Sequence, residues 1–134
     1  GGAGVDSGTA LAVDHRTIGA EPDAVFLVGT TRSTNLPQVA GAAQTTGGGS
    51  LSDGFVARFS EELLLERASY LGGRSEDSAA GVAVYPQSHD VVVVGRTSAP
   101  AEQATVVVDR PFLVFIRDRA TGAVVFAGQI VNPS

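Results

Sequence analysis

The chain contains an internal repeat, and this feature constrains its fold most strongly. The stretch Gly1–Ser7, followed by the apolar run Ala10–Val13, returns as Gly72–Ser78, followed by Gly81–Val84. The offset between the copies becomes shorter further along the chain, so the copies differ by a short insertion. A repeat of this length is typical of supersecondary units that stack side by side, as in propellers and solenoids. Because such units supply a rigid surface rather than a fixed chemistry, function must be argued from particular sites.

The composition excludes several classes of partner and of chemistry. With 134 residues, of which 43% are hydrophobic, the chain can form one domain with a packed core. The formal net charge of −5 argues against binding to nucleic acid, which requires clustered cations. All nine basic residues are arginines, scattered from Arg16 to Arg119, and we attribute this pattern to codon bias. Because the chain has no cysteine, disulfides, thiol catalysis and thiolate metal sites are excluded.

The hydropathy of the chain and its first residues indicate whether it spans a membrane and whether it is a fragment of a longer protein. No apolar run approaches the ~18 residues needed to span a bilayer, and the N-terminus lacks the pattern of a signal peptide. We therefore expect no membrane span. The sequence contains no methionine and opens with Gly1 inside a repeat, which predicts a fragment or a processed piece whose export signal would lie upstream.

Short apolar runs bounded by turn-forming residues predict an all-β fold. Their spacing is that of strands, and they lie at Ala10–Val13, Val25–Val28, Phe55–Phe59, Gly81–Val84, Val91–Val94, Val106–Val108, Phe112–Ile116 and Val124–Val131. In Phe55–Phe59 the side chains alternate, with Arg58 on the polar face, which predicts a half-buried antiparallel strand. Val91–Val94 is apolar on both faces, which predicts a central strand.

Three connecting segments complete this prediction. Ser60–Glu62 could cap a helix, but its place between a strand and a double glycine favours a turn that leads into a strand over Leu63–Tyr70. Asp118–Gly122 lies between two apolar runs and predicts a C-terminal β-hairpin. The segment Leu36–Asp53, which includes three consecutive glycines, predicts a flexible connection between units.

Several motifs follow one another in a fixed order through the first part of the chain. They are Leu36-Pro37, Gly41–Thr46, Asp53–Phe59, Ala68–Gly73, Asp77 and Gly81–Val84. In this order they resemble the SBBP-type β-propeller repeat family, over about residues 1–98. The resemblance implies propeller blades of secreted or cell-surface bacterial proteins, usually without an enzymatic role. Glu61-Glu62 departs from the family, whose turn more often carries glycine or a small residue.

The C-terminal part carries a different set of motifs. Thr105–Asp118 and Thr121–Pro133 resemble the C-terminal strands of a serpin, and Val91–Pro100 is similar to the second half of a serpin reactive loop. This resemblance covers about residues 91–134 and implies an inhibitor of serine proteases. The bait bond would fall near Arg96-Thr97 or Pro100-Ala101.

Other features of the serpin family are missing from this chain. A serpin inhibits by inserting its cleaved loop into a large sheet. The large body is absent, and Tyr85–Asp90 stands where the alanine-rich hinge is expected, so we expect no covalent trapping. The overlap of the two resemblances at Val91–Ser98 suits a gene fusion, a recombined fragment or a sequence assembled from two sources. The reactive-loop-like candidates are Gly95, Arg96, Thr97, Ser98, Ala99 and Pro100.

Candidate ligand sites in the glycine-rich stretches are weak. Gly1–Asp6 resembles one calcium-binding nonapeptide, but the tandem copies of real sites are absent. Asp6 and Asp77 are therefore predicted to be turn residues whose carboxylates accept backbone N–H bonds. Gly47–Ser50 is followed by neither a lysine nor a helix and is predicted to be a linker rather than a phosphate loop.

No catalytic arrangement is evident in the sequence. His15 and His89 are predicted to be exposed loop residues, and paired ligation by them stays open only if the repeats face one another. No nucleophile-elbow pattern supports a hydrolase triad. The adjacent acids Glu61-Glu62 and Glu76-Asp77 would point to opposite faces of a strand. We expect no enzymatic activity, no cofactor and no metal.

The sequence thus predicts an all-β protein with partial β-propeller-like antiparallel blades and a C-terminal β-hairpin. Residues 1–36 form a partial propeller-type repeat, residues 37–98 a complete repeat, and residues 99–134 the serpin-like hairpin. The predicted function is a non-enzymatic, extracellular or cell-surface structural or binding module, whose inter-strand loops bind a protein or cell-surface ligand. The alternative is a serpin-derived fragment that meets a serine protease and cannot trap it covalently on its own.

Overall fold

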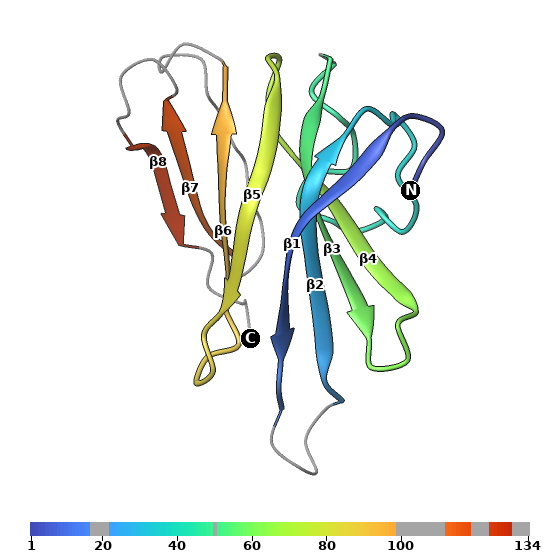
Figure 1. Ribbon diagram of the computed structural model, residues 1–134, viewed down its shortest axis with the longest axis vertical. Coiled ribbons are helices and arrows are strands. Elements are labelled where there is room, and N and C mark those ends of the chain that lie inside the picture. Colours follow the sequence, from blue (N-terminus) through green and yellow to red (C-terminus); the bar gives the residue numbers. More distant parts are fainter. Residues whose placement is uncertain (17–21, 50, 99–111, 119–123, 130–134) are drawn as a thin grey trace.

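The residues that the structure describes form two four-stranded sheets (Figure 1). The computed structural model describes all residues except 17–21, 50, 99–111, 119–123 and 130–134, and for residues 112–118 and 124–129 it describes the backbone. Sheet A contains, in spatial order, β1 (Asp6–Asp14), β2 (Ala24–Thr31), β3 (Asp53–Ser60) and β4 (Leu65–Leu71). Sheet B contains, in spatial order, β5 (Asp77–Val84), β6 (Val91–Thr97), β7 (Phe112–Asp118) and β8 (Val124–Gln129). The described residues include no helix, so the predicted all-β fold is confirmed, and no membrane-spanning helix is found among them.

The repeat in the sequence returns in the structure as two similar hairpins. β1 pairs antiparallel with β2, and β5 pairs antiparallel with β6. The register shifts between Gly8 and Ala10 in the first hairpin and between Ala79 and Gly81 in the second, which is the same place in the repeat. The copies diverge after their second strand, because β2 continues into antiparallel β3 whereas β6 is joined by a parallel neighbour.

Sheet B contains one parallel pair of strands, whereas the propeller-type prediction expected antiparallel strands throughout. β7 and β8 pair antiparallel, so the predicted C-terminal hairpin is present, but β7 pairs parallel with β6. A parallel pair needs a long crossover connection, and the stretch between Thr97 and Phe112 provides that length. Val91–Val94 lies on β6 between β5 and β7, so the predicted central strand is confirmed. The predicted strand at Val106–Val108 lies outside the described residues.

The two sheets pack against each other through an apolar core. The core consists of residues from β2, β3, β5 and β6, namely Ala24, Phe26, Val28, Val56, Ala79, Val91 and Val93. β5 contacts β1, β2 and β3, and in Figure 1 it lies next to sheet A. This packing places the β5–β6 hairpin on one face of sheet A.

A second apolar cluster covers the opposite face of sheet A. It contains Leu36, Phe55, Ala57, Ala68 and Tyr70. Phe55 and Ala57 therefore face this cluster, while Val56 faces the core between the sheets. The prediction of a half-buried strand over Phe55–Phe59 is wrong for its first residues, because β3 is buried there on both faces.

The connection between β2 and β3 lies along the free edge of β4. Ala68 N–H donates to the carbonyl of Gln38 at 3.0 Å, and Tyr70 N–H donates to the carbonyl of Gln44 at 3.0 Å. Leu36 is buried in the second apolar cluster. The prediction that Leu36–Asp53 is a flexible link between units is wrong, because this segment connects two strands of sheet A and is hydrogen-bonded to the edge strand at Gln38 and Gln44.

The predicted turn between β3 and β4 is confirmed. Ser60 N–H donates to the carbonyl of Leu64, and Leu63 N–H donates to the carbonyl of Ser60, both at 2.9 Å. Glu61 and Glu62 are exposed at the turn rather than in a helix. Leu63 has a φ of 61°, in the left-handed region that disfavours side chains other than glycine and asparagine.

We expect Leu63→Gly to raise the free energy of unfolding by about 0.5 kcal/mol. Relief of the left-handed backbone, about 1–2 kcal/mol, outweighs the extra entropy that glycine gains on unfolding, about 0.5–1 kcal/mol. Urea unfolding followed by circular dichroism measures the difference. Leu64→Gly is the matched control and should destabilise the chain, because Leu64 is not among the residues with positive φ. A Leu63→Gly variant less stable than the wild type would contradict the expectation.

Candidate functional site

The reactive-loop-like segment lies at the end of a central strand. Arg96 in β6 pairs with Ser78 in β5 and with Arg117 in β7, so the backbone on either side of it is paired. The Arg96 side chain is exposed. The structure therefore places the peptide bond after Arg96 inside sheet B, while the guanidinium remains accessible from solvent.

The remaining residues of this segment lie in different environments. Gly95 and Thr97 also belong to β6, and Ser98 follows the strand and is exposed. Thr97 is buried and forms a side-chain hydrogen bond to the Asp77 carboxylate. Ala99 and Pro100 lie outside the described residues, as does the second candidate bait bond.

The two repeat aspartates close the glycine-rich turns that precede them. Asp6 accepts a hydrogen bond from Gly2 N–H at 2.8 Å, and Asp77 accepts one from Gly73 N–H at 2.7 Å. Thr31 lies opposite Asp6 and donates its hydroxyl hydrogen bond to that carboxylate, as Thr97 does for Asp77. The predicted role of both aspartates as turn residues is confirmed.

A third aspartate has the same role, and the sequence did not single it out. Asp53 accepts a hydrogen bond from Gly48 N–H at 3.0 Å, which ties the glycine-rich connection to the start of β3. Gly72 lies between Asp53 and Asp77, because a Cβ on Gly72 would be 2.9 Å from one carboxylate oxygen and 2.5 Å from the other. The signal in the sequence was an aspartate at the start of a strand shortly after a run of glycines, as in the two repeat copies, although the donor glycine lies five residues before Asp53 and four before Asp6 and Asp77.

The three carboxyls differ in their electrostatics. Burial raises the pKa of Asp77, the nearby Asp53 charge raises it further, and hydrogen bonds from Thr97 and Gly73 oppose the shift. Burial also raises the pKa of Asp53, against the hydrogen bond from Gly48. At Asp6, burial also raises the pKa, but hydrogen bonds from two hydroxyls and a backbone N–H outweigh it. The pKa of Asp6 is therefore lowered.

These opposite shifts predict opposite pH dependences for two equivalent residues. A raised folded-state pKa means that the stability contributed by Asp77 is fully present below the unfolded pKa of about 3.9 and is lost as pH rises through the folded value. The stability contributed by Asp6 is present above that unfolded value and is lost as pH falls. As pH falls from about 7 to 4, the wild type should therefore gain stability relative to Asp77→Asn, and as pH falls below about 4 it should lose stability relative to Asp6→Asn. Urea unfolding at several pH values measures both differences, and a common sign would contradict the assignment.

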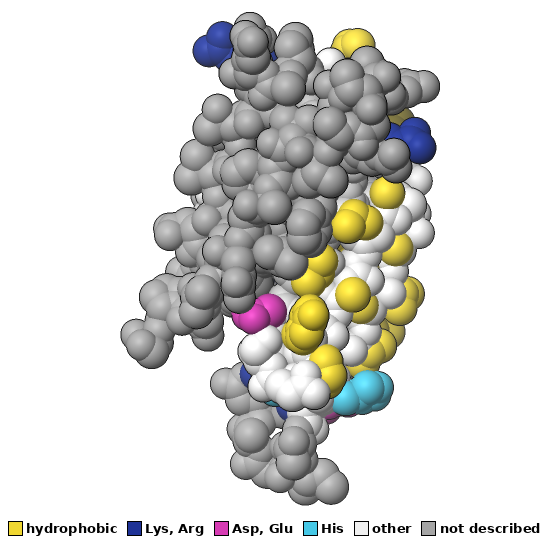
Figure 2. Space-filling model, turned by 90° about the vertical axis from the view of Figure 1, so that its left-hand side faces the viewer, with side chains coloured by type: hydrophobic (Ala, Val, Ile, Leu, Met, Phe, Trp, Pro, Cys, Tyr) yellow, Lys and Arg dark blue, Asp and Glu magenta, His cyan; other side chains and the backbone are white. Residues whose placement is uncertain are grey.

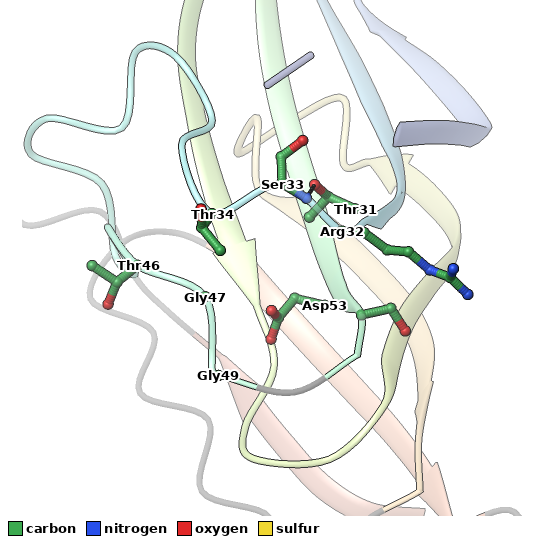
Figure 3. A pocket seen from close by; sticks show the side chains of 9 residues that line it. Thr31, Arg32, Ser33, Thr34, Thr46, Gly47, Gly49 and Asp53 are labelled. Atoms are coloured by element: carbon green, nitrogen blue, oxygen red, sulfur yellow. Dashed lines mark hydrogen bonds between the residues drawn. The ribbon is translucent and has the colours of Figure 1, made fainter. Parts of the chain in front are cut away.

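A cleft of about 280 Å³ lies beside Asp53. Its lining is made by Thr31, Arg32, Ser33, Thr34, Thr46, Gly47, Gly49, Ser52 and Asp53. Figure 3 shows the Asp53 carboxylate directed toward the loop that carries Gly47 and Gly49, whereas the Arg32 guanidinium points away. Gly47 and Gly49 of the predicted linker thus line one wall of this cleft. The cleft offers one carboxylate among hydroxyls and backbone groups, and this set suits a small polar molecule rather than a catalytic pair.

The two histidines lie in different surroundings. His15 is exposed, as predicted, and its Nδ1 lies 2.9 Å from Asp23. His89 is only half-exposed, because its Nδ1 lies 2.6 Å from the buried carboxylate of Asp14, which also accepts a hydrogen bond from Arg16 Nε at 2.9 Å. The prediction of an exposed loop residue is wrong for His89, which joins the β5–β6 turn to the end of β1. The part of the chain that is described contains no group of three or more His, Cys, Asp or Glu that could hold a metal.

Comparison with known proteins supports one of the two resemblances. The model of a family described as serpin (serine protease inhibitor) matches residues 73–133. No curated protein and no solved structure matches the chain. The matched range contains β5 to β8, whereas β1 to β4 lie before it. The resemblance of residues 1–98 to propeller-type repeats stays a prediction. The predicted serpin-like character of the C-terminal part is confirmed, and it extends toward the N-terminus to include the whole of sheet B.

Proposed function

We propose that the chain is a non-enzymatic, serpin-related binding module that engages a serine protease reversibly. The observation that carries this proposal is the extent of the serpin match, which spans one complete sheet and includes the segment around Arg96. Arg96 is exposed on this sheet, and an arginine side chain is the group that trypsin-like specificity pockets recognise. We also propose that this role is exercised outside the cell or at its surface.

Pairing within sheet B argues against covalent trapping. A serpin-type trap needs a cleaved loop that inserts as a new strand into a sheet. Gly95, Arg96 and Thr97 are already paired with β5 on one side and with β7 on the other. The segment has no free strand edge to offer, so a contact with a protease is expected to stay non-covalent.

The same pairing makes Arg96 a poor substrate in the folded chain. A protease binds an extended segment through the main chain, and the main chain of Arg96 is engaged inside sheet B. Cleavage after Arg96 therefore requires β6 to separate from a neighbour, and such openings in core strands approach the free energy of global unfolding. Arg74 is exposed in the turn between the sheets and should be cleaved first.

Binding to a trypsin-like protease whose catalytic serine is replaced by alanine tests the proposal. Arg74→Gln serves as the background, because it removes the more accessible arginine of the turn. In this background we expect saturable binding by calorimetry, weakened at least about tenfold, or about 1.4 kcal/mol, by Arg96→Gln. With active protease, a denaturing gel should show no detergent-resistant adduct. Equal binding by Arg74→Gln and by the double variant would refute the proposed contact, and a stable adduct would refute the reversible mechanism.

A structural role as a propeller-type repeat is the second candidate. The register shift lies at the same repeat position in the β1–β2 and β5–β6 hairpins, and this similarity favours the second candidate. In that role the inter-strand loops would bind a protein or cell-surface ligand, and Arg96 would have no special part. A chain that does not bind the inactive protease at all would favour this candidate.

A further inference from the structure

The β1–β2 and β5–β6 hairpins are copies of one repeat, so the residues through which one hairpin packs identify the corresponding residues of the other. The β5–β6 hairpin packs on sheet A through Ala79, Val91 and Val93, which are buried, and through Val82 and Val84, which are partly buried. Across this hairpin Val82 pairs with Val93, and Val84 pairs with Val91. These residues form what we call the inserting face of sheet B.

The β1–β2 hairpin carries the counterpart of this face. There Leu11 pairs with Leu27, and Val13 pairs with Val25, at the repeat positions of the two valine pairs in sheet B. Leu11 is 64% exposed and Val13 is 41% exposed, whereas their counterparts in β5 are partly buried against sheet A. These four residues form what we call the inserting face of sheet A. Leu27 packs against the second apolar cluster, so this apolar face is open along β1, at Leu11 and Val13.

The surface that receives the hairpin is repeated as well. Sheet A receives β5–β6 on the face that carries Phe26 and Val28, and the corresponding positions in β6 are Val92 and Val94. Val94 is 42% exposed. Figure 2, viewed from the side on which β6 to β8 lie in Figure 1, shows several hydrophobic side chains spread over the surface beside the residues drawn in grey. Val92 and Val94, with Gly81 and Ala83 opposite them, form the receiving face of sheet B.

We infer that copies of this chain associate head to tail through these two faces. The inserting face of sheet A in one copy would pack on the receiving face of sheet B in the next, which repeats between molecules the contact already made between the sheets. A second copy is the occupant because the chain itself carries both matching surfaces, and its own interior shows that two such surfaces pack together. Because each copy carries one face of each kind, further copies add until a ring closes or an open chain forms.

Two single-face variants test this arrangement in solution. Leu11→Glu places a charge on the inserting face, and Val94→Glu places one on the receiving face. Leu64→Glu is the matched control, because Leu64 is 67% exposed in the β3–β4 turn, away from both faces. By sedimentation velocity, the wild type and the control should associate as concentration rises from micromolar toward millimolar. Each single-face variant should stay monomeric alone, and their equimolar mixture should form a dimer through the remaining intact faces.

Several results would overturn the inference. The first is a wild type that stays monomeric over the whole concentration range. The second is a Val94→Glu variant that associates like the wild type. The third is an equimolar mixture of the two variants that stays monomeric although both keep the wild-type melting temperature. If a glutamate variant fails to fold, cysteine pairing replaces it, because the chain has no native cysteine. Oxidised mixtures of Leu11→Cys and Val94→Cys should give a disulfide-linked dimer, and mixtures of Leu11→Cys and Leu64→Cys should not. Equal yields from both mixtures would also overturn it.

Discussion

Gly29→Ala is expected to lower the free energy of unfolding by about 3 kcal/mol, and Gly95→Ala by a similar amount. A Cβ at position 29 would lie 1.9 Å from the carbonyl oxygen of Ser7, and a Cβ at position 95 would lie 2.3 Å from that of Ser78. Both obstacles are backbone atoms of the paired strand, so they cannot move aside without breaking the strand pairing next to the register shift. The two losses follow from one cause, because the glycines hold equivalent positions in the repeat.

Urea unfolding followed by circular dichroism measures these losses. Gly73→Ala is the matched control, because no atom lies within 4 Å of a Cβ built there and its N–H still donates to Asp77. The control should stay within about 0.5 kcal/mol of the wild type. If Gly29→Ala unfolded at the same urea concentration as Gly73→Ala, the close approach of β1 and β2 would not exist in solution.

Tyr70→Phe is expected to lower the free energy of unfolding by about 2–6 kcal/mol, the sum for two buried groups that lose their partner. Tyr70 is fully buried, and its hydroxyl donates to the carbonyl of Ser33 and accepts from Leu36 N–H, both at 2.9 Å. Phenylalanine keeps the ring but leaves a buried carbonyl and a buried N–H without partners, at a cost of about 1–3 kcal/mol each. The loss of stability should therefore affect the connection between β2 and β3 as well as sheet A.

Two measurements separate this local effect from general destabilisation. Tyr85→Phe is the control, because Tyr85 is 59% exposed, and it should leave the unfolding midpoint unchanged. Amide hydrogen exchange at Leu36 should become faster in Tyr70→Phe than the global loss of stability alone explains. Equal midpoints for the two variants would contradict the role of the Tyr70 hydroxyl.

Local patterns in the sequence were enough to predict the strands and the closed turns. The apolar run Val91–Val94 is β6, and Ser60–Glu62 opens a turn, because both follow from side-chain periodicity and from their immediate neighbours. Asp6 and Asp77 accept backbone N–H bonds as predicted, since a short carboxylate behind a glycine turn reaches only nearby donors.

Features that depend on distant parts of the chain could not be predicted in this way. The parallel pairing of β6 with β7 depends on the path of a long connection, and strand periodicity carries no information about direction. The burial of Phe55 and Ala57 depends on Leu36, which the connection from β2 brings over sheet A. The meeting of Asp53 with Asp77 follows from the packing of two sheets, and neither residue has a local signal for it.

Amide hydrogen exchange along β6 tests most directly whether the segment around Arg96 is a paired strand rather than a free loop. We predict that the amides of β6 exchange as slowly as those of β2, the corresponding strand of sheet A, and far more slowly than those of the exposed turn residues Gln87 and Ser88. Exchange of the Arg96 and Thr97 amides as fast as that of the turn would show an unpaired reactive-loop segment and would contradict the proposed reversible, non-covalent contact with a protease.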